Sequence, residues 1–190
     1  MAWCTLKGMP KRSRSLPLMA CCAALVLGAM APHAKAQAHG AETVHKAQTP
    51  SGLPVPRYVS LRHDTVNGRI GPSLDHPIRW VFHRQGLPVQ ITAETENWRR
   101  VRDPAGDVVW VHRSMVSGRR TVMVGTEPHG GVMLYKSPDE TARPVLRLGK
   151  GVIATLKSCE RQWCQLDVGD KQGWAQAKYL WGLGRQDTQR

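Results

Sequence analysis

The chain reads Asn97-Trp98-Arg99-Arg100-Val101, followed by Trp110-Val111 and Gly118, and the same order returns about 65 residues later. The second copy reads Gln162-Trp163-Cys164-Gln165-Leu166, followed by Gly173-Trp174 and Gly182. In both copies the tryptophan of the later pair stands eight positions before the glycine. A repeat with so long a period predicts two copies of one small structural unit, each with its own core. Such a pair favours a tandem binding protein over a single enzyme domain.

The residues between these patterns predict short β-strands. Val89-Gln90-Ile91-Thr92-Ala93 alternates apolar and polar side chains, as a half-buried strand does. Short runs rich in β-branched or apolar residues lie at 108–111, 121–124, 152–156 and 164–168. Glycine and proline separate the runs, and apolar residues do not recur at helical spacing over three turns. The fold class is therefore expected to be all-β, built from small barrels or sandwiches.

These patterns also divide the chain into segments. The two repeated units have about 60 residues each, a size at which a domain is only marginally stable on its own. The expected segments are a signal peptide at 1–36, a disordered tether at 37–54, a first domain at 55–124, a joint at 125–131, a second domain at 132–184 and a tail at 185–190.

The first 36 residues have the layout of a secretory signal peptide. Four basic side chains precede the uncharged, largely apolar run 16–31, and the small-x-small site Ala34-Lys35-Ala36 follows it. The run is short for a transmembrane helix. We expect cleavage after Ala36, which gives a periplasmic or secreted protein with no transmembrane segment in the mature chain. An uncleaved anchor and lipid attachment at Cys21 are the alternatives.

Charge and cysteine usage fit an exported protein. The signal segment holds five basic and no acidic residues, so its removal lowers the formal net charge from +13 to +8. A basic protein is attracted to polyanions, and outside the cytosol these are envelope polymers or anionic lipids rather than nucleic acid. A basic surface with no specific partner is the alternative.

Only Cys159 and Cys164 remain in the mature chain. Two cysteines five positions apart in an oxidising compartment favour a local disulfide, worth about 2 kcal/mol by chain entropy. A zinc site needs more ligands than this pair supplies nearby, and a redox dithiol usually has a tighter spacing. We therefore expect a structural bridge and no metal.

Strand alternation separates an inner from an outer face in both copies. In the second copy Cys164 and Leu166 point to one side, and Trp163 points to the other. In the first copy Trp98 and Arg100 share the face opposite to Val101, and Arg102 follows on the same face. A tryptophan beside two arginines on the outer face is a candidate recognition surface. The alternative is that Trp98 covers one end of a small barrel.

The ordered motifs carry a family resemblance. The first unit opens with Asn67-Gly68-Arg69-Ile70-Gly71-Pro72 and continues with the Asn97 and Trp110 patterns. The second has a cysteine pair around Trp163 and closes with Leu180-Trp181-Gly182. Over residues 55–184 the chain resembles the bacterial SH3 domain family, particularly exported Gram-negative proteins that carry two such domains. It departs from the family pattern at two positions. Gly68 stands where an apolar residue is usual, and this glycine is expected to loosen the strand. Val109 stands where glycine is frequent. The second unit lacks the Asn-x-Arg opening, so a binding role of that opening would be confined to the first unit.

The resemblance implies two five-stranded SH3-like barrels without catalytic residues or cofactors. Related domains bind cell-wall peptides or other proteins through a groove lined by the middle-strand tryptophan and residues near the final turn. The ligand-binding residues expected here are Asn67, Arg69, Trp98, Arg100, Met115, Trp163 and Tyr179.

We therefore expect a non-enzymatic module of the cell envelope that recognises a peptide, a cell-wall component or an envelope protein through an aromatic, arginine-rich groove. The alternatives are an accessory or structural envelope protein without a ligand groove and a cell-wall hydrolase. The chain has no G-x-S-x-G elbow, no H-E-x-x-H motif and no spare cysteine for a Cys-His nucleophile, which argues against the hydrolase.

Overall fold

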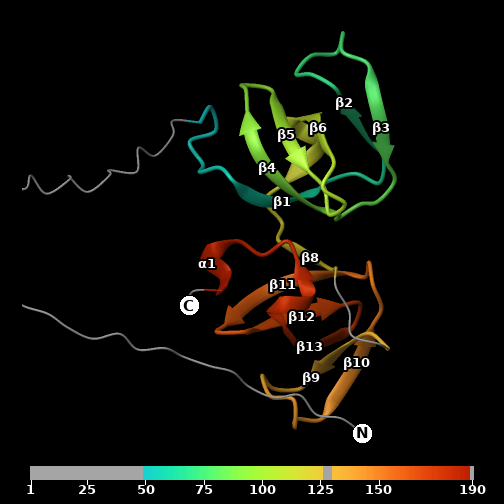
Figure 1. Cartoon of the computed structure of the whole chain (residues 1–190), viewed down its shortest axis with the longest axis vertical. Helices are drawn as coiled ribbons and strands as arrows, with labels where there is room; N and C mark the ends of the chain where they lie inside the picture. The colour runs from blue at the N-terminus through green and yellow to red at the C-terminus, as the bar shows by residue number, and fades with distance from the viewer. Residues whose placement is uncertain (1–48, 126–129, 189–190) are drawn as a thin grey trace, which may run out of the picture. The chain divides into compact units, whose positions relative to one another are not determined.

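Short runs of β-branched residues form the strands of two antiparallel sheets. The computed structural model describes residues 49–125 and 130–188, all of which belong to one compact unit (Figure 1). Within this part of the chain the only α-helix is the four-residue α1 (Arg185–Thr188), so the all-β prediction is confirmed. The signal segment 1–36 and most of the expected tether lie outside the described residues.

The first sheet, called here the first barrel, has the strand order β3-β2-β6-β5-β4-β1-β7. Its strands are β1 (Arg57–Leu61), β2 (Val66–Arg69), β3 (Ile78–Phe82), β4 (Pro88–Glu94), β5 (Trp98–Arg102), β6 (Val108–His112) and β7 (Val116–Ser117). The 3₁₀ turn η1 (Arg113–Met115) links the last two strands.

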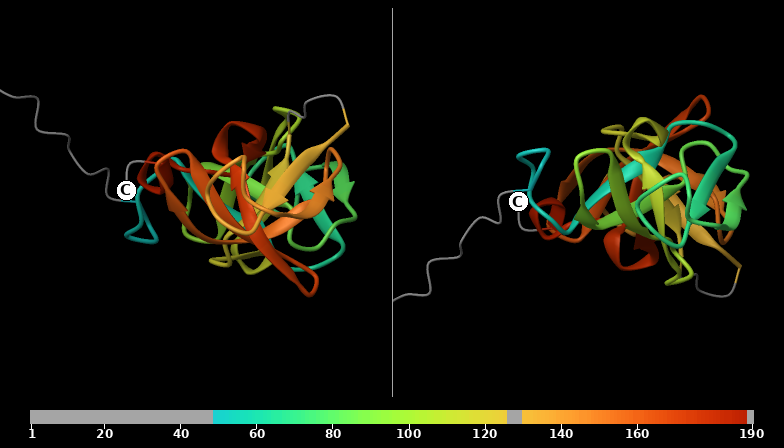
Figure 2. Two further views of the ribbon diagram at one scale, coloured as in Figure 1. Left: turned by 90° about the horizontal axis from the view of Figure 1, so that it is seen from below. Right: turned by 90° about the horizontal axis from the view of Figure 1, so that it is seen from above.

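The second sheet, the second barrel, has the corresponding order β10-β9-β13-β12-β11-β8-β14. Its strands are β8 (Thr121–Val124), β9 (Val132–Tyr135), β10 (Pro144–Leu148), β11 (Ile153–Glu160), β12 (Trp163–Val168), β13 (Lys171–Gln176) and β14 (Leu180–Trp181), with η2 (Ala177–Tyr179) before the last. The strands of both sheets curl instead of lying flat (Figure 2). The predicted tandem SH3-like architecture is confirmed, but each sheet has seven strands where five were expected. One extra strand is the two-residue piece that follows each 3₁₀ turn and pairs with the first strand of its sheet.

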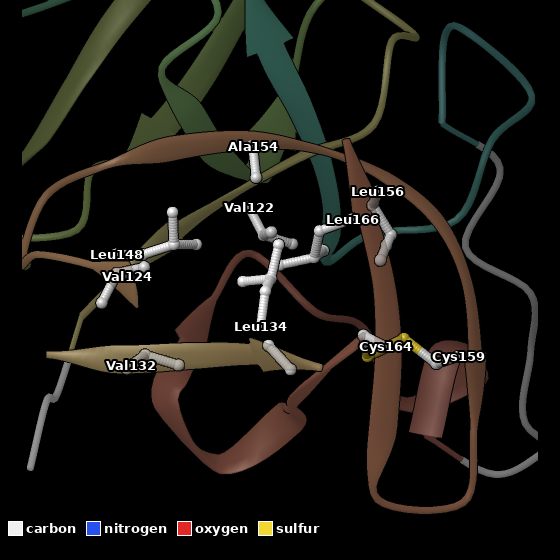
Figure 3. Packing of buried hydrophobic residues seen from close by; sticks show 11 residues of the cluster. Val122, Val124, Val132, Leu134, Leu148, Ala154, Leu156, Cys159, Cys164 and Leu166 are labelled. Carbon is white, nitrogen blue, oxygen red and sulfur yellow. A yellow bond between two sulfur atoms is a disulfide. The ribbon is translucent and has the colours of Figure 1, made fainter. Parts of the chain in front are cut away.

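Each barrel has its own hydrophobic core. The first core contains ten buried side chains, among them Ile91, Val101 and Val109. The second gathers Val122, Leu134 and Leu166 with the Cys159–Cys164 disulfide at one end (Figure 3). The disulfide bridge predicted from the sequence is therefore present.

The strand pairing divides the two units earlier than expected. Residues 121–124 were assigned to the first domain, yet β8 pairs with β11 and β14 of the second sheet. The physical reason is that Val122 and Val124 are fully buried in the second core. The three residues 118–120 therefore connect the sheets. Part of the expected joint 125–131 lies outside the described residues, and residues 130 and 131 lead into β9.

The two ends of the folded part are also more ordered than expected. The last residues of the expected tether, 49–54, turn back onto the first barrel, where Ser51 donates a 2.5 Å hydrogen bond to the carboxylate of Glu94. In the expected tail, Asp187 forms a 2.7 Å ion pair with Arg120. Each segment is held by a polar contact with a charged side chain of the fold: Ser51 with Glu94, and Asp187 with Arg120.

The register reproduces the repeat residue by residue. In the first barrel Trp98 lies opposite His112 and Arg100 lies opposite Trp110. In the second barrel Trp163 lies opposite Gln176 and Gln165 lies opposite Trp174. Directly opposed residues of an antiparallel pair point to the same side of the sheet. The two barrels therefore present equivalent outer faces.

The two departures from the family pattern explain each other. A Cβ atom on Gly68 of β2 would lie 2.8 Å from Cγ2 of Val109 on β6, so the valine occupies the space that a side chain on β2 would need. In the second barrel Leu134 of β9 fills the same space and Gly173 of β13 makes room for it, because a Cβ there would lie 3.0 Å from Leu134 Cβ. Gly68 thus permits close packing of β2 against β6, and the pairing of β2 with β3 shifts register directly after it.

Candidate functional site

The outer face of the second barrel carries three aromatic side chains close together. Tyr135 of β9 lies opposite Trp174 of β13, which in turn lies opposite Gln165 of β12. One step along the strands, Trp163 lies opposite Gln176. The rings of Tyr135 and Trp163 meet edge to face with their centroids 5.8 Å apart. This geometry is favourable for aromatic pairs and holds both rings at the surface.

Three adjoining cavities extend from this aromatic pair, and together they are called here the second-barrel groove. The largest, about 590 Å³, is lined by Pro138, Trp163 and the turn 160–162. A cavity of about 190 Å³ shares residues 161 and 162 with it and continues to Gln176. A third, of about 280 Å³, also borders Gln176 and reaches Tyr135 and Tyr179. The second cavity thus shares lining residues with each of the other two.

Gln176 stands at the centre of the second-barrel groove, between the first and last cavities. Its Nε2 atom donates a hydrogen bond to the carboxylate of Glu140. Its Oε1 atom is buried and accepts no hydrogen bond within the described part of the chain. A buried acceptor without a partner is costly, so a shift of this side chain that turns Oε1 toward a ligand N–H group would be favourable.

The charges around the groove are mixed. Glu140 and Glu160 lie on its rim together with Arg161, Arg147 and Lys178. The Nζ atom of Lys178 lies 4.8 Å from the centroid of the Tyr179 ring, within cation–π range. The groove is thus mainly aromatic and amide in character, with no single dominant sign of charge.

The equivalent face of the first barrel has different chemistry. The positions of Tyr135, Trp174 and Gln165 are taken by Arg69, Trp110 and Arg100. The guanidinium of Arg69 donates to the backbone carbonyl of His76 at 2.6 Å. The side chain of Arg100 is exposed and forms no hydrogen bond or ion pair within residues 49–125 and 130–188. This face is therefore cationic where its counterpart is neutral.

Trp98 is far less accessible than an exposed recognition residue. It retains 8% of its exposed area, and its ring meets that of His112 edge to face at 5.5 Å. This burial favours the alternative that Trp98 covers one end of the first barrel.

The residues predicted to bind ligand do not converge on one site. Asn67, Arg69 and Arg100 lie on the first barrel, on β2 and β5. Met115 is half-buried against the first core. Trp163 and Tyr179 both line the second-barrel groove. The repeat therefore predicted positions that are equivalent in the two units, and these positions lie on two barrels instead of around one site.

Sequence reasoning missed Tyr135 and Gln176. Their importance follows from pairing between β9, β13 and β12, strands that are distant along the chain. The aromatic residue after Val132-Met133-Leu134 was the only local signal.

Two further features of the described residues bear on chemistry. No group of three or more His, Cys, Asp or Glu side chains in residues 49–125 and 130–188 is arranged to hold a metal ion. No helix in this part of the chain has the length and apolar character needed to cross a membrane.

Comparison with known proteins assigns the chain to a family. The sequence profile of the bacterial SH3 domain matches residues 62–118 and 129–182, more than half of the chain. No curated protein matches the chain. Two solved structures from Trichomonas vaginalis, NlpC2 and NlpC1, are each 12% identical with a TM-score of 0.31 over 66% of this chain. The chain covers 48% and 45% of those proteins, less than half of each. On the strength of the two profile matches and the two equivalent sheets, the chain belongs to the bacterial SH3 domain family.

Proposed function

We propose that this protein is a non-enzymatic binding module of the cell envelope and that its second-barrel groove takes a peptide of the cell wall. Bacterial SH3 domains are typically cell-wall binding modules. The disulfide is compatible with the oxidising compartment that a signal peptide cleaved after Ala36 would lead to. The basic surface supports a general attraction to anionic envelope polymers.

The observation that carries this proposal is the unpartnered Oε1 atom of Gln176 between aromatic walls. A peptide supplies backbone N–H donors in abundance, and apolar or aromatic walls exclude water around such a bond. Trp163 and Tyr179 stand on the two sides of Gln176 and would contact the side chains of the ligand. The neutral character of the groove suits a peptide better than a strongly charged polymer.

The test is binding of residues 37–190 to purified peptidoglycan at low and moderate salt. Trp163→Ala is expected to weaken binding at least tenfold, because tryptophans that a ligand covers are typical hot spots. Gln176→Ala should weaken it about fivefold through loss of one hydrogen bond. Gln172→Ala, on the same strand but outside the groove, is the matched control.

Two results would contradict the proposal. One is the absence of saturable binding. The other is retention that disappears at moderate salt and ignores Trp163→Ala, since exposed charges are screened over about 8 Å at physiological ionic strength. That second result would assign the binding to net charge. Hydrolysis of peptidoglycan by the pure protein would overturn the non-enzymatic role.

A further inference from the structure

The loop between β2 and β3 exposes an unusual amount of apolar surface. Its members Ile70, Leu74 and Ile78 retain 55%, 73% and 45% of their exposed area. The other exposed large hydrophobic side chains in the described part of the chain are Leu53 at 53% and Val145 at 36%. Single exposed apolar residues need no explanation, but three within nine residues concentrate exposed apolar surface in one short segment. We call residues 70–78 the apolar loop; it projects from the first barrel (Figure 1).

The apolar loop is held in one conformation. Ile70 donates its backbone N–H to the carbonyl of Pro77 at 3.1 Å, and the Arg69 guanidinium holds the carbonyl of His76. The ring of His76 packs over Gly71, where a Cβ atom would lie 2.3 Å from it. The backbone of the loop is thus ordered before binding, so binding does not carry the entropy cost of ordering it.

A cationic row begins at the base of this loop. Ile78 lies opposite Arg69, Arg69 lies opposite Trp110, and Trp110 lies opposite Arg100. Arg69, Trp110 and Arg100 therefore lie in one line across β2, β6 and β5 on a single face, and Ile78 pairs with Arg69 where the register of β2 and β3 shifts. Beyond the loop, Arg79 places its guanidinium 5.3 Å from the centroid of the Trp80 ring. The apolar loop therefore adjoins a row that contains two arginines and a tryptophan.

At the equivalent positions the second barrel keeps the tryptophan but lacks the apolar loop and both arginines. Its row across the same strands reads Pro144, Tyr135, Trp174 and Gln165. Its corresponding loop, 136–143, has no large apolar side chain and contains two acidic and two basic residues. The common fold therefore does not require the apolar loop or the cationic row.

We propose that the first barrel binds the surface of an anionic phospholipid bilayer through the apolar loop and the row Arg69–Trp110–Arg100. Aliphatic side chains enter the acyl boundary, tryptophan is favoured at the interface, and arginines pair with headgroup phosphates. A protein partner is disfavoured, because the surface area that one nine-residue loop can offer is far smaller than the roughly 1,000 Å² that a specific protein interface buries. This site is separate from the second-barrel groove and does not depend on its function.

The test is co-sedimentation of residues 37–190 with vesicles of phosphatidylglycerol and phosphatidylethanolamine, compared with phosphatidylcholine vesicles. Binding is expected only to the anionic vesicles. Leu74→Ser should weaken it about tenfold, as removal of one inserted leucine predicts. Arg100→Gln, which installs the residue of the second barrel, should weaken it about fivefold at low salt. Val145→Ser, which alters an exposed apolar residue of the second barrel, is the control and should bind as the wild type does.

Leu74 is so exposed that its replacement leaves folding intact, which an unchanged melting temperature would verify. Peptidoglycan binding by Leu74→Ser should also be unchanged, so the failure of one proposal is distinguishable from the failure of the other. The membrane proposal is overturned if the anionic vesicles bind no protein. It is equally overturned if Leu74→Ser binds them as tightly as the wild type, which would leave net charge as the whole cause.

Discussion

At the scale of single residues, the most constrained ionisable group is Glu94 at the end of β4. Its side chain is 1% exposed and forms ion pairs with Arg57 at 2.8 Å and Arg99 at 2.9 Å. Burial by itself raises the pKa of Glu94. Hydrogen bonds from Arg57, Ser51 and Thr49 and the charge of Arg57 outweigh burial, and the pKa falls from 4.5 to about 2. The carboxylate thus ties the segment before β1 to the barrel.

This arrangement predicts a specific acid sensitivity. Because the pKa of Glu94 is lower in the folded state, its stabilisation is complete above pH 4.5 and is lost as the pH falls toward 2. Glu94→Gln should lower the free energy of unfolding at pH 7 by about 3 kcal/mol, since it leaves two arginines without their shared carboxylate. Denaturant unfolding between pH 2 and 7 measures both effects. A variant that lost stability with acid as steeply as the wild type would contradict this role of Glu94.

The sequence offered no sign of this cluster around Glu94. Ser51 belonged to a stretch whose composition predicts disorder, and Glu94 followed an ordinary alternating strand. Their contact joins residues 43 positions apart and depends on the pairing of β1 with β4. By contrast, the disulfide was predictable because both its residues lie on one hairpin.

At the scale of strands, the position of one glycine differs between the barrels. In the first barrel it is Gly68 on β2, with Val109 facing it from β6; in the second it is Gly173 on β13, with Leu134 facing it from β9. Gly68→Ala would bring a Cβ to 2.8 Å from Val109 and should destabilise the protein by about 2 kcal/mol through overpacking. Val109→Gly should also destabilise, because it empties space in the first core. The double variant Gly68→Leu/Val109→Gly recreates the Leu134/Gly173 arrangement. It should be at least about 1 kcal/mol more stable than the sum of Gly68→Leu and Val109→Gly, each measured alone, predicts.

Gly118→Ala is the matched control for these measurements. Its new Cβ would meet no atom within 4 Å, so the change in unfolding free energy should stay within about 0.5 kcal/mol. Strict additivity in the Gly68 and Val109 cycle would show that the two positions do not share one space.

The strands themselves were largely predictable, and their partners were not. Alternation placed Val89–Ala93 and the run before Val168 correctly because the signal is local. The assignment of β8 to the first domain failed for a different reason. A β-branched run of four residues fits the core of either barrel, and only the burial of Val122 and Val124 in the second core decides between them.

At the scale of the whole described part, the two sheets meet through buried hydroxyl groups. The Oγ1 atom of Thr121 on β8 lies 2.7 Å from the hydroxyl of Ser60 on β1 and 2.7 Å from the carbonyl oxygen of Gly86. Ser60 also donates to the carbonyl of Arg119 at 2.6 Å. Tyr58 and Trp181, one from each sheet, meet edge to face with centroids 5.1 Å apart. A three-residue connection and satisfied buried polar groups favour barrels that unfold together.

Thr121→Val tests that coupling, because it keeps the shape of the side chain and removes its hydroxyl. The change leaves the Gly86 carbonyl and the Ser60 hydroxyl with one partner fewer in a buried place, so we expect a loss of about 2 kcal/mol. Calorimetry of residues 37–190 should show one transition for the wild type. The variant should show a broader or divided transition, since the loss falls on the contact between the barrels and spares both cores. Thr92→Val removes a hydroxyl bond within the first barrel and should leave a single transition. Two separate transitions in the wild type would mean that each barrel is stable alone and that the hydroxyl contacts contribute little to cooperativity.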